Sequence, residues 1–186
     1  MNVVETRLPG VLIIEPTAFG DAHGFFMETW NRRCYEEHGV PTSFVQDNLS
    51  YSVKGVLRGL HFQNPDPQGK LAYVLQGEVF DVAVDIRLGS PTFGEWVGVV
   101  LSAENKRQLY VPGGVAHGFA VTSEAALFSY KGTSYYNPET KHSLLWNDPE
   151  VGIDWPIYEP ILSIKDQGAL PLREIPANLL PRYERD

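Results

Sequence analysis

Hydrophobic and polar residues alternate most regularly between Val79 and Arg87, near the middle of the chain. The apolar residues at every second position are Phe80, Val82, Val84 and Ile86. Because successive side chains of a strand point to opposite faces, this spacing predicts a strand with one buried face. The other face carries Asp81, Asp85 and Arg87, and we interpret it as a solvated or ion-paired surface without a chemical role.

Shorter runs of the same character occur along most of the chain. The other predicted strands are Val11–Ile14, Ser43–Ser52, Gly55–Gln63, Lys70–Gln76, Trp96–Leu101, Gln108–Val111, Val115–Val121 and Ala126–Lys131. The 17 glycines and 14 prolines suit the turns between such strands. This pattern predicts an all-β sandwich or barrel.

Helical signals are few. Residues 28–39 predict one helix, which ends at Gly39 and Pro41, and a second short helix is expected near Ala169. Roughly the last 40 residues are rich in proline and predict an irregular tail. The sequence contains no internal repeat and no linker, so we expect residues 1–186 to form a single domain.

Composition narrows the class of protein. The chain has 186 residues, a formal net charge of −8 and an isoelectric point near 5.1, which argues against nucleic-acid binding. Its single cysteine, Cys34, cannot form an internal disulfide and fits a reducing compartment. The sequence has neither a signal peptide nor an apolar run long enough to cross a membrane, so we expect a soluble, cytoplasmic protein.

The segment Gly55–Gln63, followed by Lys70, combines apolar strand residues with basic ones. Arg58 and His61 lie within this segment, and Lys70 begins the next predicted strand. Cationic groups in an apolar sheet are costly unless they meet an anionic or polar partner. The segment therefore predicts one wall of a small-molecule site.

A second histidine, His117, follows a turn in Pro112-Gly113-Gly114-Val115-Ala116-His117. This spacing resembles the second motif of the cupin superfamily, a double-sheet jelly roll. In metal-binding cupins the first motif supplies two histidines one residue apart and a glutamate, whereas this chain has His61-Phe62-Gln63. Because a catalytic metal needs about three suitable ligands, the sequence favours the fold and disfavours a metal site.

Each of these residues also has a purely structural interpretation. A single histidine in a β protein is commonly a hydrogen-bonded structural residue. Tyr130 and Tyr136 taken alone would be ordinary sheet aromatics, and Arg58 and Lys70 would be surface charges. Each structural interpretation is reasonable for one residue alone. It is less convincing when two histidines and two basic residues occur together in one sheet region.

The ordered motifs resemble the dTDP-4-dehydrorhamnose 3,5-epimerase family from Val11 to Asp166. The residues that carry this resemblance are Gly55–Gln63, Gln68–Leu71, Gly77–Arg87, His117–Phe119, Trp146–Pro149, Asp154–Pro156 and Leu162–Asp166. The resemblance implies a cupin-like jelly-roll homodimer that needs no metal and no cofactor, because the ketone of the substrate serves as the electron sink.

The resemblance also implies roles for individual residues. His61 would be the general base, oriented by Asp166, while Lys70 with His117 would stabilise the enolate and Tyr130 would return a proton to the opposite face. Implied substrate-binding residues are Arg58, Lys165, Tyr136, Phe26, Glu28, Gln46, Asp47 and Asn48. The substrate would be a nucleotide-linked 4-keto-sugar.

Two departures from the family pattern lie at implied substrate contacts. His23 stands where the family has an arginine that reaches the diphosphate, and Lys141 stands where it has a glutamate. A third, Ala72-Tyr73, replaces Val-Arg. We therefore keep three alternatives open: an epimerase that inverts a single centre, a non-catalytic sugar-binding jelly roll, and a metal-dependent cupin.

Overall fold

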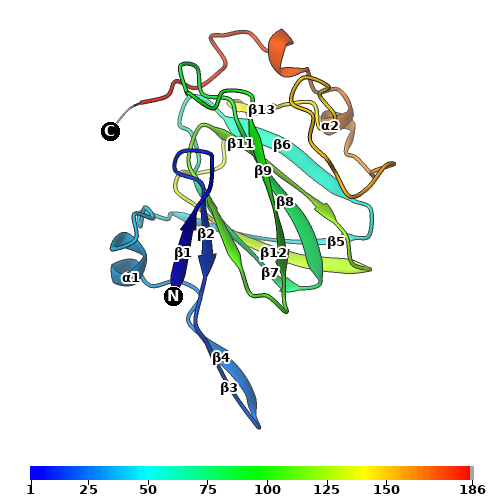
Figure 1. Ribbon diagram of the computed structural model, residues 1–186. Coiled ribbons are helices and arrows are strands. Elements are labelled where there is room, and N and C mark those ends of the chain that lie inside the picture. Colours follow the sequence, from blue (N-terminus) through cyan, green and yellow to red (C-terminus); the bar gives the residue numbers. More distant parts are fainter. Residues whose placement is uncertain (185–186) are drawn as a thin grey trace.

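The computed structural model describes residues 1–184 and consists mainly of two facing β-sheets (Figure 1). One sheet has six strands in the order β1-β2-β10-β7-β12-β5, and the other has five in the order β13-β6-β11-β8-β9. The strands of the first are β1 Asn2–Glu5, β2 Leu12–Glu15, β10 Gln108–Val111, β7 Lys70–Gln76, β12 Ala125–Gly132 and β5 Gln46–Val53. Those of the second are β13 Lys141–Ser143, β6 Leu57–Gln63, β11 Val115–Val121, β8 Glu78–Asp85 and β9 Trp96–Ser102. The predicted all-β, double-sheet jelly roll is confirmed.

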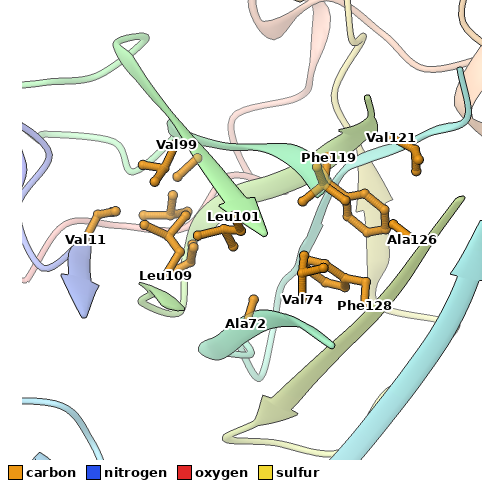
Figure 2. Close-up of a cluster of buried hydrophobic side chains, with 14 of the residues drawn as sticks. Val11, Ala72, Val74, Val99, Leu101, Leu109, Phe119, Val121, Ala126 and Phe128 are labelled. Carbon is orange, nitrogen blue, oxygen red and sulfur yellow. The ribbon is translucent and has the colours of Figure 1, made fainter. Parts of the chain in front are cut away.

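The main core fills the space between the sheets (Figure 2). Its buried side chains include Ala72, Leu109 and Phe128 from the six-stranded sheet, and Leu101 and Phe119 from the five-stranded sheet. Apolar groups from both inner faces are removed from water here, which is the main favourable contribution to folding.

The outer face of the five-stranded sheet is covered as well. Val82 and Val84 of β8 pack there against Trp155, Leu172 and Leu180 of the C-terminal region. That region contains helix α2, Ile164–Gln167, and a 3₁₀ turn, Leu172–Glu174. Because both faces of this sheet are buried, charged residues on β8 must find partners inside the protein.

This double coverage corrects the interpretation of the charged face of β8. Asp81 and Asp85 are fully buried, so the face is not solvated. The prediction of ion pairing is confirmed for Asp85, which accepts hydrogen bonds from Arg87 Nε and Nη2 at 2.9 and 2.8 Å. Asp81 instead hydrogen-bonds to His117.

The predicted helix at residues 28–39 is shorter in the structure. Helix α1 covers Arg32–Glu36, because Asn31 caps its start by accepting a hydrogen bond from Cys34 N at 3.2 Å. Gly39 follows with a positive φ of 76°, a conformation that ends helices. The helix expected near Ala169 is α2, which ends two residues earlier.

Sequence analysis missed four short strands: β1, β13 and the hairpin of β3, Ala18–Asp21, and β4, Gly24–Met27. The hairpin extends away from the two sheets (Figure 1). Phe19, Phe25 and Phe26 are 68%, 62% and 75% exposed on it. Such apolar exposure on a two-stranded ribbon is unusual.

Two glycines bring β6 and β11 unusually close. A Cβ atom on Gly59 would lie 2.6 Å from the Cα of Gly118, and one on Gly118 would lie 2.6 Å from the carbonyl oxygen of Arg58. Gly59 also has a positive φ of 121°, which side chains disfavour. The β6–β11 register shifts at this point, between His117 and Phe119.

Candidate active site

A cavity of about 290 Å³ opens between the two sheets, and both sheets contribute to its walls. From the five-stranded sheet it is lined by Arg58, His61, His117, Gly118, Phe119 and Lys141, and from the six-stranded sheet by Asn48, Leu49, Ser50, Lys70, Phe128 and Tyr130. A smaller recess of about 80 Å³ shares His61, Lys70, Tyr130 and Lys141 with it and adds Tyr136. The fold thus gathers residues that lie up to 93 positions apart, from Asn48 to Lys141, in one place.

His61 is held by a buried carboxylate. Its Nε2 donates a hydrogen bond of 2.6 Å to Oδ1 of Asp166, a residue of α2 that is only 3% exposed. Ser163 caps this short helix by accepting from Asp166 N, and Gly59 N contacts the second carboxylate oxygen at 3.4 Å. With the Nε2 proton directed at Asp166, Nδ1 carries the lone pair of the neutral ring.

The electrostatics keep this ring neutral. Burial lowers the pKa of His61, and Lys141 and Lys70 lower it further, against the opposing effect of Asp166. Burial by itself would raise the pKa of Asp166, but the hydrogen bond and charge of His61, together with the hydrogen bonds of Ser163 and Gly59, lower the pKa. The pair is therefore a neutral imidazole beside a carboxylate, the form in which a histidine accepts a proton.

A second histidine–carboxylate pair lies beside the first. His117 pairs directly with His61 across β11 and β6, and its Nε2 donates to Oδ1 of Asp81 at 2.6 Å. His117 is 5% exposed and Asp81 is fully buried. The other oxygen of Asp81, Oδ2, has no hydrogen-bond partner within residues 1–184.

Asp81 was not predicted as a site residue from the sequence, where it was assigned no chemistry. A signal was present in the sequence: Val79 and Ala83 share the strand face of Asp81, and an apolar face packs against the other sheet, where no water can satisfy a carboxylate.

Lys70 and Tyr130 form the opposite wall. They lie on neighbouring strands β7 and β12, and the Lys70 ammonium is 5.8 Å from the centre of the Tyr130 ring. Burial lowers the pKa of Lys70 to about 8, with a further contribution from Lys141. Burial raises the pKa of Tyr130, so its phenol remains protonated at neutral pH.

Other predicted residues lie around this centre. Arg58 at the cavity wall donates to Ser52 Oγ at 3.0 Å, and Lys165 lies exposed on α2 next to Asp166. Tyr136 lies at the recess, where its backbone N–H donates to Gln46 Oε1 at 2.9 Å.

The predicted run Gln46, Asp47 and Asn48 is divided by strand alternation. Asn48 lines the cavity and accepts from Gln46 Nε2 at 2.9 Å. Asp47 instead forms an ion pair with Lys131 at 3.0 Å and is not among the cavity-lining residues. Successive side chains of a strand point to opposite faces, so Asp47 is directed away from Asn48, and its role in substrate binding stays a prediction.

Three predicted substrate contacts lie outside the cavity of this chain. His23 and Phe26 belong to the β3–β4 hairpin region, where the His23 side chain is 94% exposed and contacts Asp21 at 3.5 Å. Glu28 follows the hairpin and accepts a hydrogen bond from Asn31. The hairpin extends away from the two sheets (Figure 1), and none of the three residues lines the cavity that holds His61.

Among residues 1–184, no three histidine, cysteine or acidic side chains are grouped as metal ligands. The expectation of a metal-free site stays a prediction. No helix in the described part of the chain is long and apolar enough to span a membrane.

Comparison with known proteins identifies the family. The family model described as dTDP-4-dehydrorhamnose 3,5-epimerase matches residues 5–174. The chain belongs to the dTDP-4-dehydrorhamnose 3,5-epimerase family.

Individual members of this family are highly similar to the chain. The dTDP-4-dehydrorhamnose 3,5-epimerase of Salmonella typhimurium is 58% identical over 172 residues, which cover 91% of this chain and 94% of that protein. A dTDP-6-deoxy-D-glucose-3,5-epimerase from Legionella pneumophila, solved with dTDP-4-keto-L-rhamnose, superposes with a TM-score of 0.96 at 56% identity and covers 99% of both chains. The dTDP-4-dehydrorhamnose 3-epimerase of Streptomyces niveus is 42% identical over 98% of this chain and 90% of that protein.

Proposed function

We propose that the protein is an isomerase that inverts C3, C5 or both in a nucleoside-diphospho-4-keto-6-deoxyhexose. By analogy with its relatives, the substrate is dTDP-4-dehydro-6-deoxy-D-glucose and the product dTDP-4-dehydro-L-rhamnose. The observation that carries the proposal is the position of His61 and Tyr130, which line the same cavity from opposite sheets. Inversion requires a base on one face of a carbon and an acid on the other.

His61 is the proposed general base. The C4 ketone acidifies the protons on C3 and C5, and the neutral imidazole accepts one of them at Nδ1. Asp166 fixes the ring orientation and stabilises the imidazolium that forms, as carboxylates do in other histidine dyads. The α2 cap at Ser163 in turn holds Asp166 in place.

Lys70 and His117 are proposed to stabilise the enolate. Negative charge moves to the C4 oxygen as the proton leaves, and a fixed cation in a site that excludes water is most effective at this moment. Lys70 supplies the charge, and His117, oriented by Asp81, supplies a polar contact from the neighbouring strand.

Tyr130 is the proposed proton donor. Its raised pKa keeps the phenol protonated until a carbanion forms, and Lys70 at its ring face stabilises the phenolate that remains. Protonation from the six-stranded sheet, opposite His61, inverts the carbon. The electron pair rests on the substrate's own oxygen throughout, so the reaction as proposed uses no cofactor.

The remaining predicted residues are proposed to bind the nucleotide and diphosphate. Arg58, Lys165, Tyr136, Gln46 and Asn48 lie at or beside the cavity.

His23 and Phe26 of the hairpin, and Glu28 just after it, fit this role only if they reach another copy of the chain. We therefore propose a homodimer to which the N-terminal strands contribute, with residues 1–186 as one epimerase domain and the cytoplasm as its location. The exposed phenylalanines of the hairpin support the dimer.

Deuterium uptake tests the proposed function. The wild-type protein in heavy water is expected to exchange C3–H or C5–H of dTDP-4-dehydro-6-deoxy-D-glucose, observed by proton NMR, and His61→Ala is expected to lose this exchange. Absence of exchange by the wild type with every nucleotide offered would refute the proposal and favour a sugar-binding protein. Stoichiometric metal in the purified protein would favour a metal-dependent cupin instead.

Exchange confined to one carbon would identify a single-centre epimerase. The similarity to the 3-epimerase of Streptomyces niveus is the reason to resolve both positions separately.

A further inference from the structure

Lys141 lies at a position in the cavity that the proposed chemistry does not use. It belongs to the edge strand β13, where it pairs with Gln63 of β6, so its side chain shares a sheet face with His61 two residues away. It lines both the main cavity and the adjoining recess. Lys141 is partly buried, and none of the hydrogen bonds or ion pairs within residues 1–184 involves its ammonium group.

The surroundings of Lys141 are rich in cations and poor in free anions. Arg58 and Lys165 are close enough that their charges, after burial itself, lower the pKa of Lys141. The carboxylate that favours its charged form, Asp166, already accepts hydrogen bonds from His61 and from Gly59 N. A cluster of cations without a counter-ion is unfavourable in the free protein and is ready to bind an anion.

We propose that Lys141 binds the sugar-linked phosphate of the substrate's diphosphate, together with Arg58 and Lys165. The inference rests on the proposed function for the identity of the anion. The diphosphate is the one strongly anionic part of such a substrate.

The position of Lys141 selects between the two phosphates. It lies beside His61 and Lys70, where the sugar ring must sit to react, so the phosphate attached to the sugar is the nearer one. A lysine is a point charge that suits phosphate oxygens without requiring a fixed approach angle.

Binding of two nucleotides distinguishes the loss of this one phosphate contact from a general loss of nucleotide affinity. In dTDP the second phosphate corresponds to the sugar-linked one, and in dTMP it is missing. Calorimetric titration of Lys141→Met is expected to show dTDP binding weakened by about 10-fold or more, as for loss of one charge-assisted contact. Binding of dTMP is expected to change by less than about 2-fold, since the lost contact is not made by that ligand.

Two further variants complete the test. Lys141→Arg retains the charge and is expected to recover most of the affinity for dTDP. Lys54→Met removes an exposed lysine that pairs with Glu124, away from the cavity, and is expected to leave both affinities unchanged.

Several outcomes would overturn the inference. Equal weakening of dTDP and dTMP would mean that Lys141 only shapes the site, and unchanged dTDP binding with slower proton exchange would mean that it acts on the enolate or on His61. If Lys141→Met does not fold, Lys141→Gln takes its place under the same criteria. Because nucleotide binding needs no turnover, failure of the wild type to exchange protons would refute the proposed function and leave this test intact.

Discussion

Two clusters of charged side chains are enclosed by the sheets of this protein, and they differ in how their charges are neutralised. Around Asp85 every charge has a partner: Arg87 donates twice, and Ser90 and Thr92 donate to the same oxygen at 2.6 and 2.7 Å. In the cavity, Lys70 and Lys141 line the same space, and neither forms an ion pair with a carboxylate within residues 1–184.

The difference separates a structural cluster from a functional one. In the Asp85 cluster the hydrogen bonds outweigh burial and lower the pKa of Asp85, so the charged form is stable. In the cavity, burial lowers the pKa of Lys70, the charge of Lys141 lowers it further, and the opposing effect of Asp81 does not offset them. Charges that remain unneutralised in the free protein are available to a ligand.

The largest effect is expected from removing the base. His61→Ala should lower proton exchange by about 10⁴-fold, the upper range for loss of a general base. Binding of dTDP should remain within a few-fold of wild type, since the imidazole acts on the sugar. Heavy-water NMR and calorimetry measure the two quantities.

A matched histidine variant controls for this change. His38→Ala removes an exposed imidazole that contacts Cys34 O near α1, and it should leave exchange at the wild-type rate. An His61→Ala protein that exchanges as fast as His38→Ala would show that another group is the base.

The second prediction sets the two clusters directly against each other. Lys70→Met should lower exchange by about 10²–10³-fold through loss of enolate stabilisation, yet it should raise the free energy of unfolding, because an uncompensated cation is removed. Arg87→Met should do the opposite: unfolding becomes easier by about 3–5 kcal/mol because Asp85 loses its partner, while the folded protein keeps its activity. Chemical denaturation and exchange assays on both variants give the comparison.

The pH dependence of stability sharpens the same contrast. Unfolded Lys70 titrates near 10.5 and folded Lys70 at about 8, so the unfolded chain binds more protons between these values. The wild type should therefore gain stability as the pH rises from about 8 towards 10.5, relative to Lys70→Met. Identical pH profiles for the two proteins would show that Lys70 is not buried as a charge.

The third prediction concerns the carboxylate that sequence analysis missed. Asp81→Asn should slow exchange by about 10–100-fold, by analogy with loss of the carboxylate behind a metal-bound histidine. The mechanism is loss of the orientation of His117, so kcat should fall while dTDP binding is retained. A weakened dTDP affinity with unchanged kcat would place His117 in ligand binding instead.

The smallest effect is that of pH on kcat/KM of the wild type. The acid limb should fall below pH 6.5, because the pKa of His61 is lowered and its neutral form persists to lower pH. The alkaline limb should begin near pH 8, where free Lys70 loses its proton, and reach about a 10-fold loss by pH 9. In Lys141→Met both limbs should move to higher pH, since one neighbouring positive charge is gone.

The strands of this fold were predictable where alternation is strong. Residues 70–76, 108–111 and 115–121 were predicted with their observed bounds, because buried strands between turns leave a clear pattern. Strand β13 was not, since its position is set by pairing with β6 and by Phe62 packing on His142, which no local pattern encodes.

The candidate site also has a part that could be predicted from the sequence and a part that could not. His61, Lys70, His117 and Tyr130 meet in one cavity as expected, since motif order and the jelly-roll topology bring their strands together. The contact between His61 and Asp166 spans 105 positions and depends on where a four-residue helix docks, which only the resemblance supplied. The hairpin residues His23 and Phe26 are placed outside the cavity by a β-ribbon whose four-residue strands are too short to read from the sequence.

The close approach of Gly59 and Gly118 has a consequence for anyone who tries to retarget this scaffold. Libraries that vary Arg58, Lys141 or Tyr136 can change which sugar nucleotide is accepted, because those residues line the cavity or its recess. Randomising either glycine would instead yield mostly inactive clones, since even a methyl group drives the two backbones apart. Two missing side chains thus set the spacing between His61 and His117, and in a redesign they belong among the positions to leave untouched.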